Sequence, residues 1–142
     1  MPGSFTVKNL FFDRKAIIDA LGRARAQAMA KAGAFVRTRG RSKLRRRKAS
    51  SQPGQPPSSH TDDLKNKTYF SYDPATRSEV IGPEKYKKGV ADVIEKGGTE
   101  TLTDKHGKTR AATYKPRPWM GPALAEEVQA GTIPSVWHNS IK

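Results

Sequence analysis

The sequence contains no cysteine and no long apolar run. Without cysteine, neither a disulfide nor a thiolate metal site is available to the fold. No apolar stretch approaches the roughly 20 residues that a helix needs to cross a bilayer. Residues 1–15 lack the basic start and the apolar stretch of a signal peptide, so we expect the protein to be made and used in a cytosol.

Apolar residues are also scarce, at 35% of the 142 residues. A chain of this length is typical of one domain, and so low an apolar fraction predicts that part of it lies outside any core. We therefore expect a modest core with mobile extensions.

Acidic residues are absent from one long segment of the chain. Between Ala20 and Thr61 there are eleven Lys and Arg residues and no Asp or Glu, whereas the balance from Asp62 to Lys142 is only +2. Most of the net charge of +14 therefore belongs to one segment. Such a segment favours an acidic partner, either a phosphate backbone, an anionic membrane or an acidic protein face.

A long N-terminal helix is predicted to begin after Asp13, which is a suitable N-cap residue. Gly22 and Gly33 weaken this helix without ending it. Helical structure is expected to continue to about Arg47, where so many arginines require a neutralising partner. Apolar residues at steps of three and four give the helix one alanine-rich stripe, consisting of Ile17, Leu21, Ala24, Ala28, Ala32 and Phe35.

Residues 49–60, ASSQPGQPPSSH, form a Pro/Gly/Ser segment. Its prolines fix φ and lack amide donors, so this segment is predicted to be extended and stiff, and to reach a neighbour rather than fold back. We therefore divide the chain into a first helix with a basic extension at 1–48, an arm at 49–64 and an α+β core at 65–142. The core and the first helix are expected to form a single domain.

Two hairpins are predicted after the arm. KTYFSYD and RSEVIGP alternate with period two and are joined by a turn at Asp73–Thr76. TETLTD and TRAATYK form the second pair around the turn KHGK. Together they predict a small antiparallel β-sheet of two hairpins.

Short helices complete the predicted α+β fold. One covers residues 89–96 and is stopped by Gly97-Gly98. Another covers residues 122–130, with Glu126 and Glu127 placed in its first turns to suit the helix dipole. Val136, Trp137 and Ile141 are expected to anchor a last short turn.

No constellation of side chains points to catalysis. His60, Thr61, Asp62 and Asp63 stand together, but no second histidine follows at a metal-ligand spacing, and a polar linker that caps the next turn is the simpler interpretation. Gly97-Gly98-Thr99 lacks the flanking pattern of a phosphate loop. We therefore predict no enzyme activity, no metal and no cofactor.

The basic segment, Arg37–Lys48, carries eight positive charges in twelve residues and no negative one. This pattern is specific for anion binding but not for one anion, because no recognition helix or aromatic RNA-binding motif accompanies it. A solvated basic face without a partner is the simplest alternative. The candidate docking residues are Arg37, Arg39, Arg41, Lys43, Arg45, Arg46, Arg47 and Lys48.

The corner, residues 114–124 (YKPRPWMGPAL), is the second distinctive piece. Its prolines hold it extended before a helix begins near Gly121-Pro122. Trp119 and Met120 are large apolar anchors, predicted to be buried near the alanine-rich stripe or at a subunit joint. The alternative is a strand-to-helix connection that only caps the core.

The order of these pieces resembles the neck and tail-component family of tailed bacteriophages, whose small proteins complete the head–tail junction. That family has a Pro-Gly-x-Pro-Pro…His-Thr-Gly-x-Leu loop, a Val/Ile-Gly-Pro strand end, a Glu-x-Gly-Gly turn and an Arg-Pro-aromatic-Met-x-Pro-Ala-Leu corner. The matching residues here are Pro53, Gly54, Pro56, Pro57, His60, Thr61, Leu64, Ile81, Gly82, Pro83, Glu95, Gly97, Gly98, Arg117, Pro118, Trp119, Met120, Pro122, Ala123 and Leu124. The resemblance covers most of the chain from Phe11 to Ile141, and Asp62 departs from it by standing where the family usually has glycine.

The resemblance implies a structural protein without enzyme activity or cofactor. It implies assembly as a closed ring around the DNA channel, for which we favour six-fold over twelve-fold symmetry. The implied partners are further copies of the chain, adjoining portal, adaptor, stopper or tail-tube proteins and, transiently, phage DNA, with no membrane. The implied location is the neck of the virion, after assembly in the cytoplasm of the bacterial host.

In such a ring, the arm with Pro53, Gly54, Pro56, Pro57 and His60 is expected to lie across the next subunit. The basic segment then faces either acidic surfaces of an adjoining ring or the DNA in the lumen. Because lumenal DNA must move, we favour protein docking for most of the segment and DNA contact for a minority. The alternative from another class is a stand-alone nucleic-acid-binding protein that uses the segment on phosphates.

Overall fold

The computed structural model describes residues 13–84, 90–138 and 140. Their order is the predicted one, with a long first helix, two antiparallel hairpins and C-terminal helices in an α+β fold. Gly89 and Ile141, which belonged to two predicted elements, lie outside the described residues. The elements are α1 (Arg14–Lys43), β1 (Arg45–Arg46), β2 (Ser58–Ser59), α2 (Asp63–Asn66), β3 (Thr68–Asp73), β4 (Ser78–Pro83), α3 (Val90–Lys96), β5 (Gly98–Thr103), β6 (Thr109–Tyr114), α4 (Met120–Gln129) and α5 (Thr132–Ser135).

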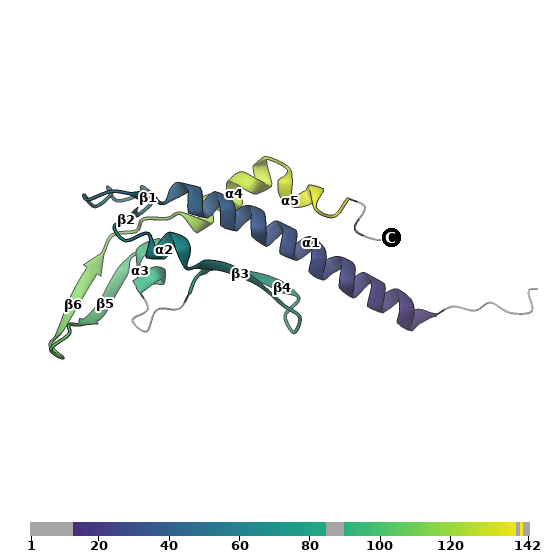
Figure 1. Cartoon of the computed structure of the whole chain (residues 1–142), viewed down its shortest axis with the longest axis horizontal. Helices are drawn as coiled ribbons and strands as arrows, with labels where there is room; N and C mark the ends of the chain where they lie inside the picture. The colour runs from purple at the N-terminus through teal and green to yellow at the C-terminus, as the bar shows by residue number, and fades with distance from the viewer. Residues whose placement is uncertain (1–12, 85–89, 139, 141–142) are drawn as a thin grey trace, which may run out of the picture.

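Helix α1 is the longest element and runs along much of the length of an elongated molecule (Figure 1). It has 30 residues, which gives a length of about 45 Å at the usual rise per residue. The predicted cap at its start is confirmed, because the Asp13 carboxylate accepts a hydrogen bond of 2.9 Å from the Ala16 amide. Helices α4 and α5 pack on one side of α1 and the β3–β4 hairpin on the other (Figure 1).

The strands form three separate two-stranded sheets within the described residues, so the two predicted hairpins do not share one sheet, and the parallel pair β1–β2 was not predicted. The β3–β4 hairpin pairs Thr68 with Pro83 at one end and Asp73 with Ser78 at the turn. The β5–β6 hairpin pairs Gly98 with Tyr114 and contains no buried residue. Figure 1 shows this second hairpin projecting away from α1, so it lacks the layer of packing that the first hairpin has.

The core is small and lies along the middle of α1. Ile17, Leu21 and Phe35, which the stripe included, are 45%, 44% and 46% exposed, so that part of the prediction was wrong. No residue of Arg14–Arg23 is buried, since this end of α1 projects past the other described elements (Figure 1). The buried apolar side chains of the described residues are Ala24, Ala28, Ala32, Val36, Leu44, Pro57, Trp119, Ala123 and Val136.

Two glycines allow α1 to approach its neighbours closely. A Cβ atom at Gly33 would lie 2.6 Å from Glu79 Oε1 and 2.9 Å from Phe70 Cδ2, on the two strands of the first hairpin. A Cβ atom at Gly40 would lie 2.6 Å from Met120 Sδ, at the start of α4. A Cβ atom at Gly33 would meet the Phe70 ring and the buried Glu79 carboxylate, which have little room to move. A Cβ atom at Gly40 would meet the flexible end of the Met120 side chain, which can move aside.

We expect Gly33→Ala to lower the free energy of unfolding by about 1–3 kcal/mol, because overpacking outweighs the gain in helix propensity. Gly22→Ala in the same helix is the matched control, since nothing lies within 4 Å of a Cβ atom there. This control should raise the free energy of unfolding by about 0.5–1 kcal/mol. Urea unfolding of both variants measures the difference, and equal shifts of the same sign would contradict the close approach.

Candidate anion-docking site and its supporting corner

The basic segment divides into a helical and an extended part at Leu44. The prediction that helical structure continues to about Arg47 was wrong, because α1 ends at Lys43 and Leu44 adopts extended angles, with ψ 112°. Leu44 is 1% exposed, and Arg45 then pairs with Ser58 of the arm in a parallel ladder. Burial of one leucine and pairing with a distant strand therefore overrode the local helical pattern.

Three basic side chains of α1 form hydrogen bonds or ion pairs with other parts of the chain. The Arg37 guanidinium donates from Nε to the backbone carbonyl of Thr68 at 2.5 Å, which holds β3 against α1. Arg39 donates from Nε to Glu127 Oε1 at 2.7 Å, and Lys43 pairs with Glu126. These three side chains therefore link α1 to β3 and to α4. The buried Nε of Arg41 has no hydrogen-bond partner within the described residues.

The two glutamates that receive these cations are not in the first turns of α4. Helix α4 begins at Met120, earlier than the predicted Pro122, so Glu126 and Glu127 fall in its second half. Glu127 is 5% exposed, and the hydrogen bond from Arg39 lowers its pKa below the ordinary value although burial opposes this. The same hydrogen bond raises the pKa of Arg39. Both carboxylates therefore serve helix packing rather than the helix dipole.

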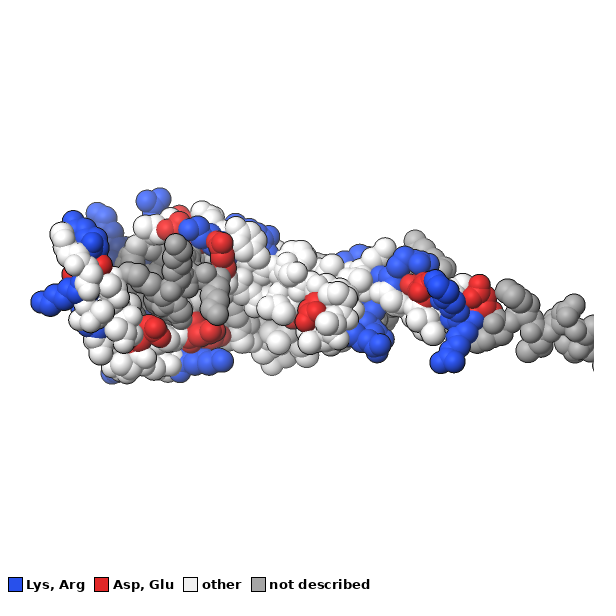
Figure 2. All heavy atoms as spheres, turned by 90° about the horizontal axis from the view of Figure 1, so that it is seen from below, with Lys and Arg blue, Asp and Glu red and all other residues white. Residues whose placement is uncertain are grey.

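The extended part remains available on the surface. Arg45, Arg46, Arg47 and Lys48 are all exposed. Arg46 Nη1 lies 4.0 Å from a carboxylate oxygen of Asp62, while Arg45 and Arg47 line a cavity on the other side. Figure 2 shows basic side chains at the end that carries the second hairpin and along the projecting part of α1, with mostly uncharged surface between them.

The arm folds back on its own chain. The prediction that this segment does not fold back was therefore wrong. Strand β2 pairs with β1, and the Gly54 amide donates to the Pro116 carbonyl at 2.9 Å. His60 donates from Nδ1 to the Arg47 carbonyl at 2.8 Å. Hydrogen bonds to the backbone, from amides and from side chains, hold the arm. Pro53, Gly54 and Gln55 stay exposed at its outer turn, and Pro57 is buried.

The corner connects the arm to α3 and α4. Arg117 donates from Nε to the Ser51 carbonyl at 3.1 Å, and its amide donates to the Ile94 carbonyl at 2.7 Å. Trp119 is 1% exposed. Pro122 lies in the first turn of α4, where its missing amide hydrogen removes no helical bond.

Glu95 caps α4, a role that the sequence analysis missed. Its Oε2 accepts hydrogen bonds from the amides of Trp119 at 2.9 Å and Met120 at 3.3 Å, and its Oε1 accepts one from Gly121 at 3.0 Å. A carboxylate that satisfies three free amides at a helix start also suits the helix dipole. Glu95 lies 24 residues before Trp119, so no local cap motif signals this contact.

Asp62 adopts the left-handed conformation, with φ 59° and ψ 5°. Glycine enters this region freely, and Asp is among the few other residues that tolerate it. The turn at this position therefore keeps a geometry that glycine suits, although the chain has Asp where the resembled family usually has glycine.

No group of three or more His, Cys, Asp or Glu side chains in the described part of the chain is placed to hold a metal ion. Within the same residues, no helix is both long and apolar enough to cross a membrane. Comparison of the chain with protein-family models, with curated proteins and with solved structures found no match.

Proposed function

We propose that the chain is a structural subunit of the neck of a tailed-phage particle. In this role, copies of the chain form a ring that joins the head to the tail and completes the DNA channel. The proposal assigns no catalytic reaction and no cofactor to the protein. Its site of action is the virion, and its partners are other copies of itself and the adjoining portal, adaptor, stopper or tail-tube proteins.

The observation that carries the proposal is that two elements expose surfaces that nothing else in the described part of the chain covers. These elements are the first part of α1 and the β5–β6 hairpin. The projecting end of α1 exposes Ile17, Ile18 and Leu21, which are 45%, 54% and 44% accessible and lie on one face of the helix. The second hairpin has no buried residue, and a lone two-stranded hairpin is marginally stable in water. A ring supplies neighbours for both elements, which a small monomer does not.

A second observation supports the resemblance on which the proposal draws. Three of the four motif segments that resemble the phage family lie in contact in the fold. Glu95 of the Glu-x-Gly-Gly turn caps the helix at Trp119, while Arg117 and Pro116 of the corner bind the arm at Ser51 and Gly54. Residues that make one joint in the fold have a shared structural reason to occur together.

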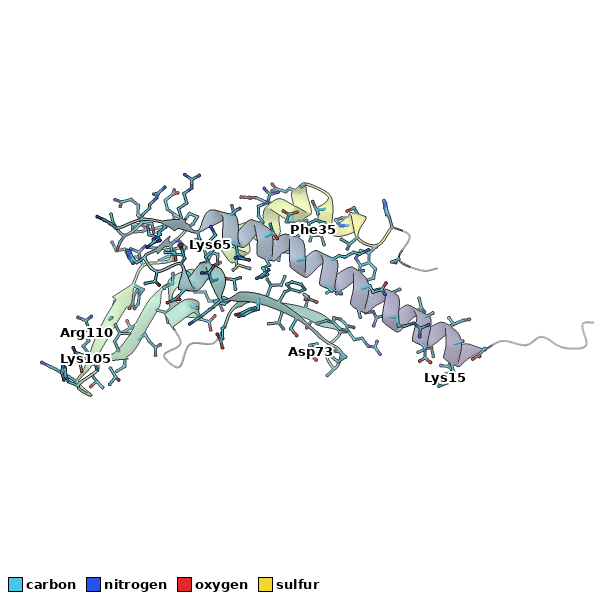
Figure 3. The ribbon with its side chains drawn as sticks, in the orientation of Figure 1. Lys15, Phe35, Lys65, Asp73, Lys105 and Arg110 are labelled. Atoms are coloured by element: carbon cyan, nitrogen blue, oxygen red, sulfur yellow. The ribbon has the colours of Figure 1, made fainter. Side chains whose placement is uncertain are left out.

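Native mass spectrometry of the purified chain tests the proposal. We expect a closed oligomer, with six subunits favoured, that Ile17→Ser/Ile18→Ser/Leu21→Ser weakens without loss of the folded signal in circular dichroism. The control is Lys15→Ala/Asp19→Ala, which removes an exposed ion pair of 2.7 Å from the same turns and leaves the net charge unchanged. Figure 3 shows Lys15 at the projecting end of α1. A monomer at all concentrations, alone and with portal or tail-tube protein, would reject the ring.

The alternative is a stand-alone nucleic-acid-binding protein. The exposed positions of Arg45, Arg46, Arg47 and Lys48 favour it, because phosphate contacts need accessible cations. A chain that stays monomeric and shifts duplex DNA of any sequence in a gel would support this alternative over the ring.

A further inference from the structure

A polar cavity of about 480 Å³ lies between the end of α1, the strand β1 and the arm. Its basic lining residues are Lys43, Arg45 and Arg47, and no Asp or Glu lines it. Ser51 and Ser58 line the same cavity from the arm. The cavity therefore presents hydrogen-bond donors from two stretches of chain and no carboxylate.

Strand alternation explains why these arginines face the cavity. Successive side chains of a strand point to opposite sides, so Arg45 and Arg46 of β1 face opposite ways, and Arg47, the next residue, lines the same cavity as Arg45. Arg46 accordingly approaches Asp62, at 4.0 Å, while Arg45 and Arg47 line the cavity. Lys48 is exposed and is not among the lining residues. The basic segment thus has two distinct faces.

The charge on the cavity side lacks a counterion. Lys43 is paired with Glu126, but neither Arg45 nor Arg47 has a carboxylate within 4.0 Å in the part of the chain that the structure describes. Two like charges that face one concavity repel each other, and an anion bound between them offsets this repulsion. The hydroxyls of Ser51 and Ser58 are buried and have no hydrogen-bond partner within the described residues.

The walls of the cavity are held in place before any ligand arrives. The ladder between β1 and β2 joins Arg45 to Ser58. Ser51 is held by Arg117, and the turn of the arm is held at Gly54 by Pro116. A site whose donors are already positioned loses less conformational entropy when it binds.

We propose that this cavity binds a phosphate group, of the kind carried by a nucleic-acid backbone. Two guanidinium groups and two hydroxyls offer more donors than the two oxygens of one carboxylate accept, whereas a phosphate presents its charge on several oxygens at once. The inference deepens the proposed function and rests on it for the source of the phosphate, since a neck ring surrounds DNA. Phosphate affinity itself is a property of the isolated chain and does not require the ring.

The test compares two double variants of equal charge. Arg45→Ala/Arg47→Ala changes the cavity side, and Arg46→Ala/Lys48→Ala changes the other side. We expect the cavity variant to lose about tenfold or more in affinity for a 20-base-pair duplex, and the control variant to lose at most about twofold. The salt slope of the cavity variant should fall by about two units. Equal losses in the two variants would overturn the site in favour of diffuse charge.

A charge-neutral pair keeps the test decisive if an arginine variant fails to fold. Ser58→Ala removes a lining hydroxyl, and Ser50→Ala removes an exposed one outside the cavity. Ser58→Ala alone should weaken binding of inorganic phosphate, measured by chemical-shift titration, and inorganic phosphate should compete with the duplex. Phosphate that produces no saturable shifts, or poly-glutamate that binds while phosphate and duplex do not, would overturn the proposal. Native mass spectrometry measures the oligomer independently of phosphate binding. Loss of phosphate binding with an intact oligomer would therefore reject this site and leave the proposed ring untouched.

Discussion

Replacing Trp119 with alanine should lower the free energy of unfolding by about 3–5 kcal/mol. Trp119 is 1% exposed and is among the largest fully buried side chains of the described residues. It lines, with Ile81, Pro83 and Ala91, the region where β4, α3 and the start of α4 meet. Removing the indole ring would leave a cavity where these three elements meet.

Trp119→Phe separates packing from hydrogen bonding in this prediction. The buried Nε1 of Trp119 has no hydrogen-bond partner within the described residues, so phenylalanine removes an unsatisfied donor while it keeps most of the ring. We expect Trp119→Phe to cost clearly less than Trp119→Ala in urea unfolding. The Glu95 cap uses the backbone amide of residue 119 and is retained in both variants. A melting temperature that is nearly unchanged in Trp119→Ala would show that this side chain is not part of the core.

Features that depend on local sequence could be predicted. Asp13 caps α1 because its side chain reaches an amide only three residues away. The two hairpins follow from period-two alternation around short turns, and the turn after Asp73 is supported by that carboxylate, which accepts hydrogen bonds from Ala75 and Thr76. Such contacts are readable because the partners are neighbours in the chain.

Features that depend on distant pairing could not be predicted in the same way. The partners of Arg39 and Lys43 lie 88 and 83 residues further along the chain. From the sequence, Glu126 and Glu127 could equally stabilise the helix dipole or form ion pairs with a distant helix. Only the packing of α1 against α4 shows that they form ion pairs. The fold-back of the arm is a similar case, because its backbone hydrogen bonds leave no mark on side-chain composition.

The candidate site illustrates the same distinction. Eight cations within twelve residues appear equivalent in the sequence, yet the end of α1 at Lys43 separates four helical residues from the four exposed residues that follow Leu44. Arg45 and Arg46 point to opposite sides because they are successive residues of β1, which becomes informative once β1 is known to pair with β2. The structure therefore divides the predicted docking segment: Arg46 lies near Asp62, whereas Arg45 and Arg47 line the cavity.

Arg39→Ala should be strongly destabilising at neutral pH and much less so in acid. The variant leaves Glu127, whose side chain is 7% exposed, without the guanidinium that lies 2.7 Å away in the native protein. In the native protein, the hydrogen bond from Arg39 holds the pKa of Glu127 below its ordinary value of 4.5. That pair therefore stabilises the fold above pH 4.5, and its contribution is lost as the pH falls through the lowered pKa.

Without Arg39, burial is the largest remaining influence on Glu127 and raises its pKa, so the ionised carboxylate becomes a cost above the ordinary pKa. The melting temperature of Arg39→Ala should then lie several degrees below that of the native protein at pH 7, and the gap should narrow toward pH 3. Lys15→Ala is the control, since it removes a cation from an exposed pair and should change the melting temperature little. In Arg39→Ala/Glu127→Gln the dependence of the gap on pH should disappear. A gap of equal size at pH 3 and pH 7 would assign the loss to packing of the arginine stem and reject the buried pair as its cause.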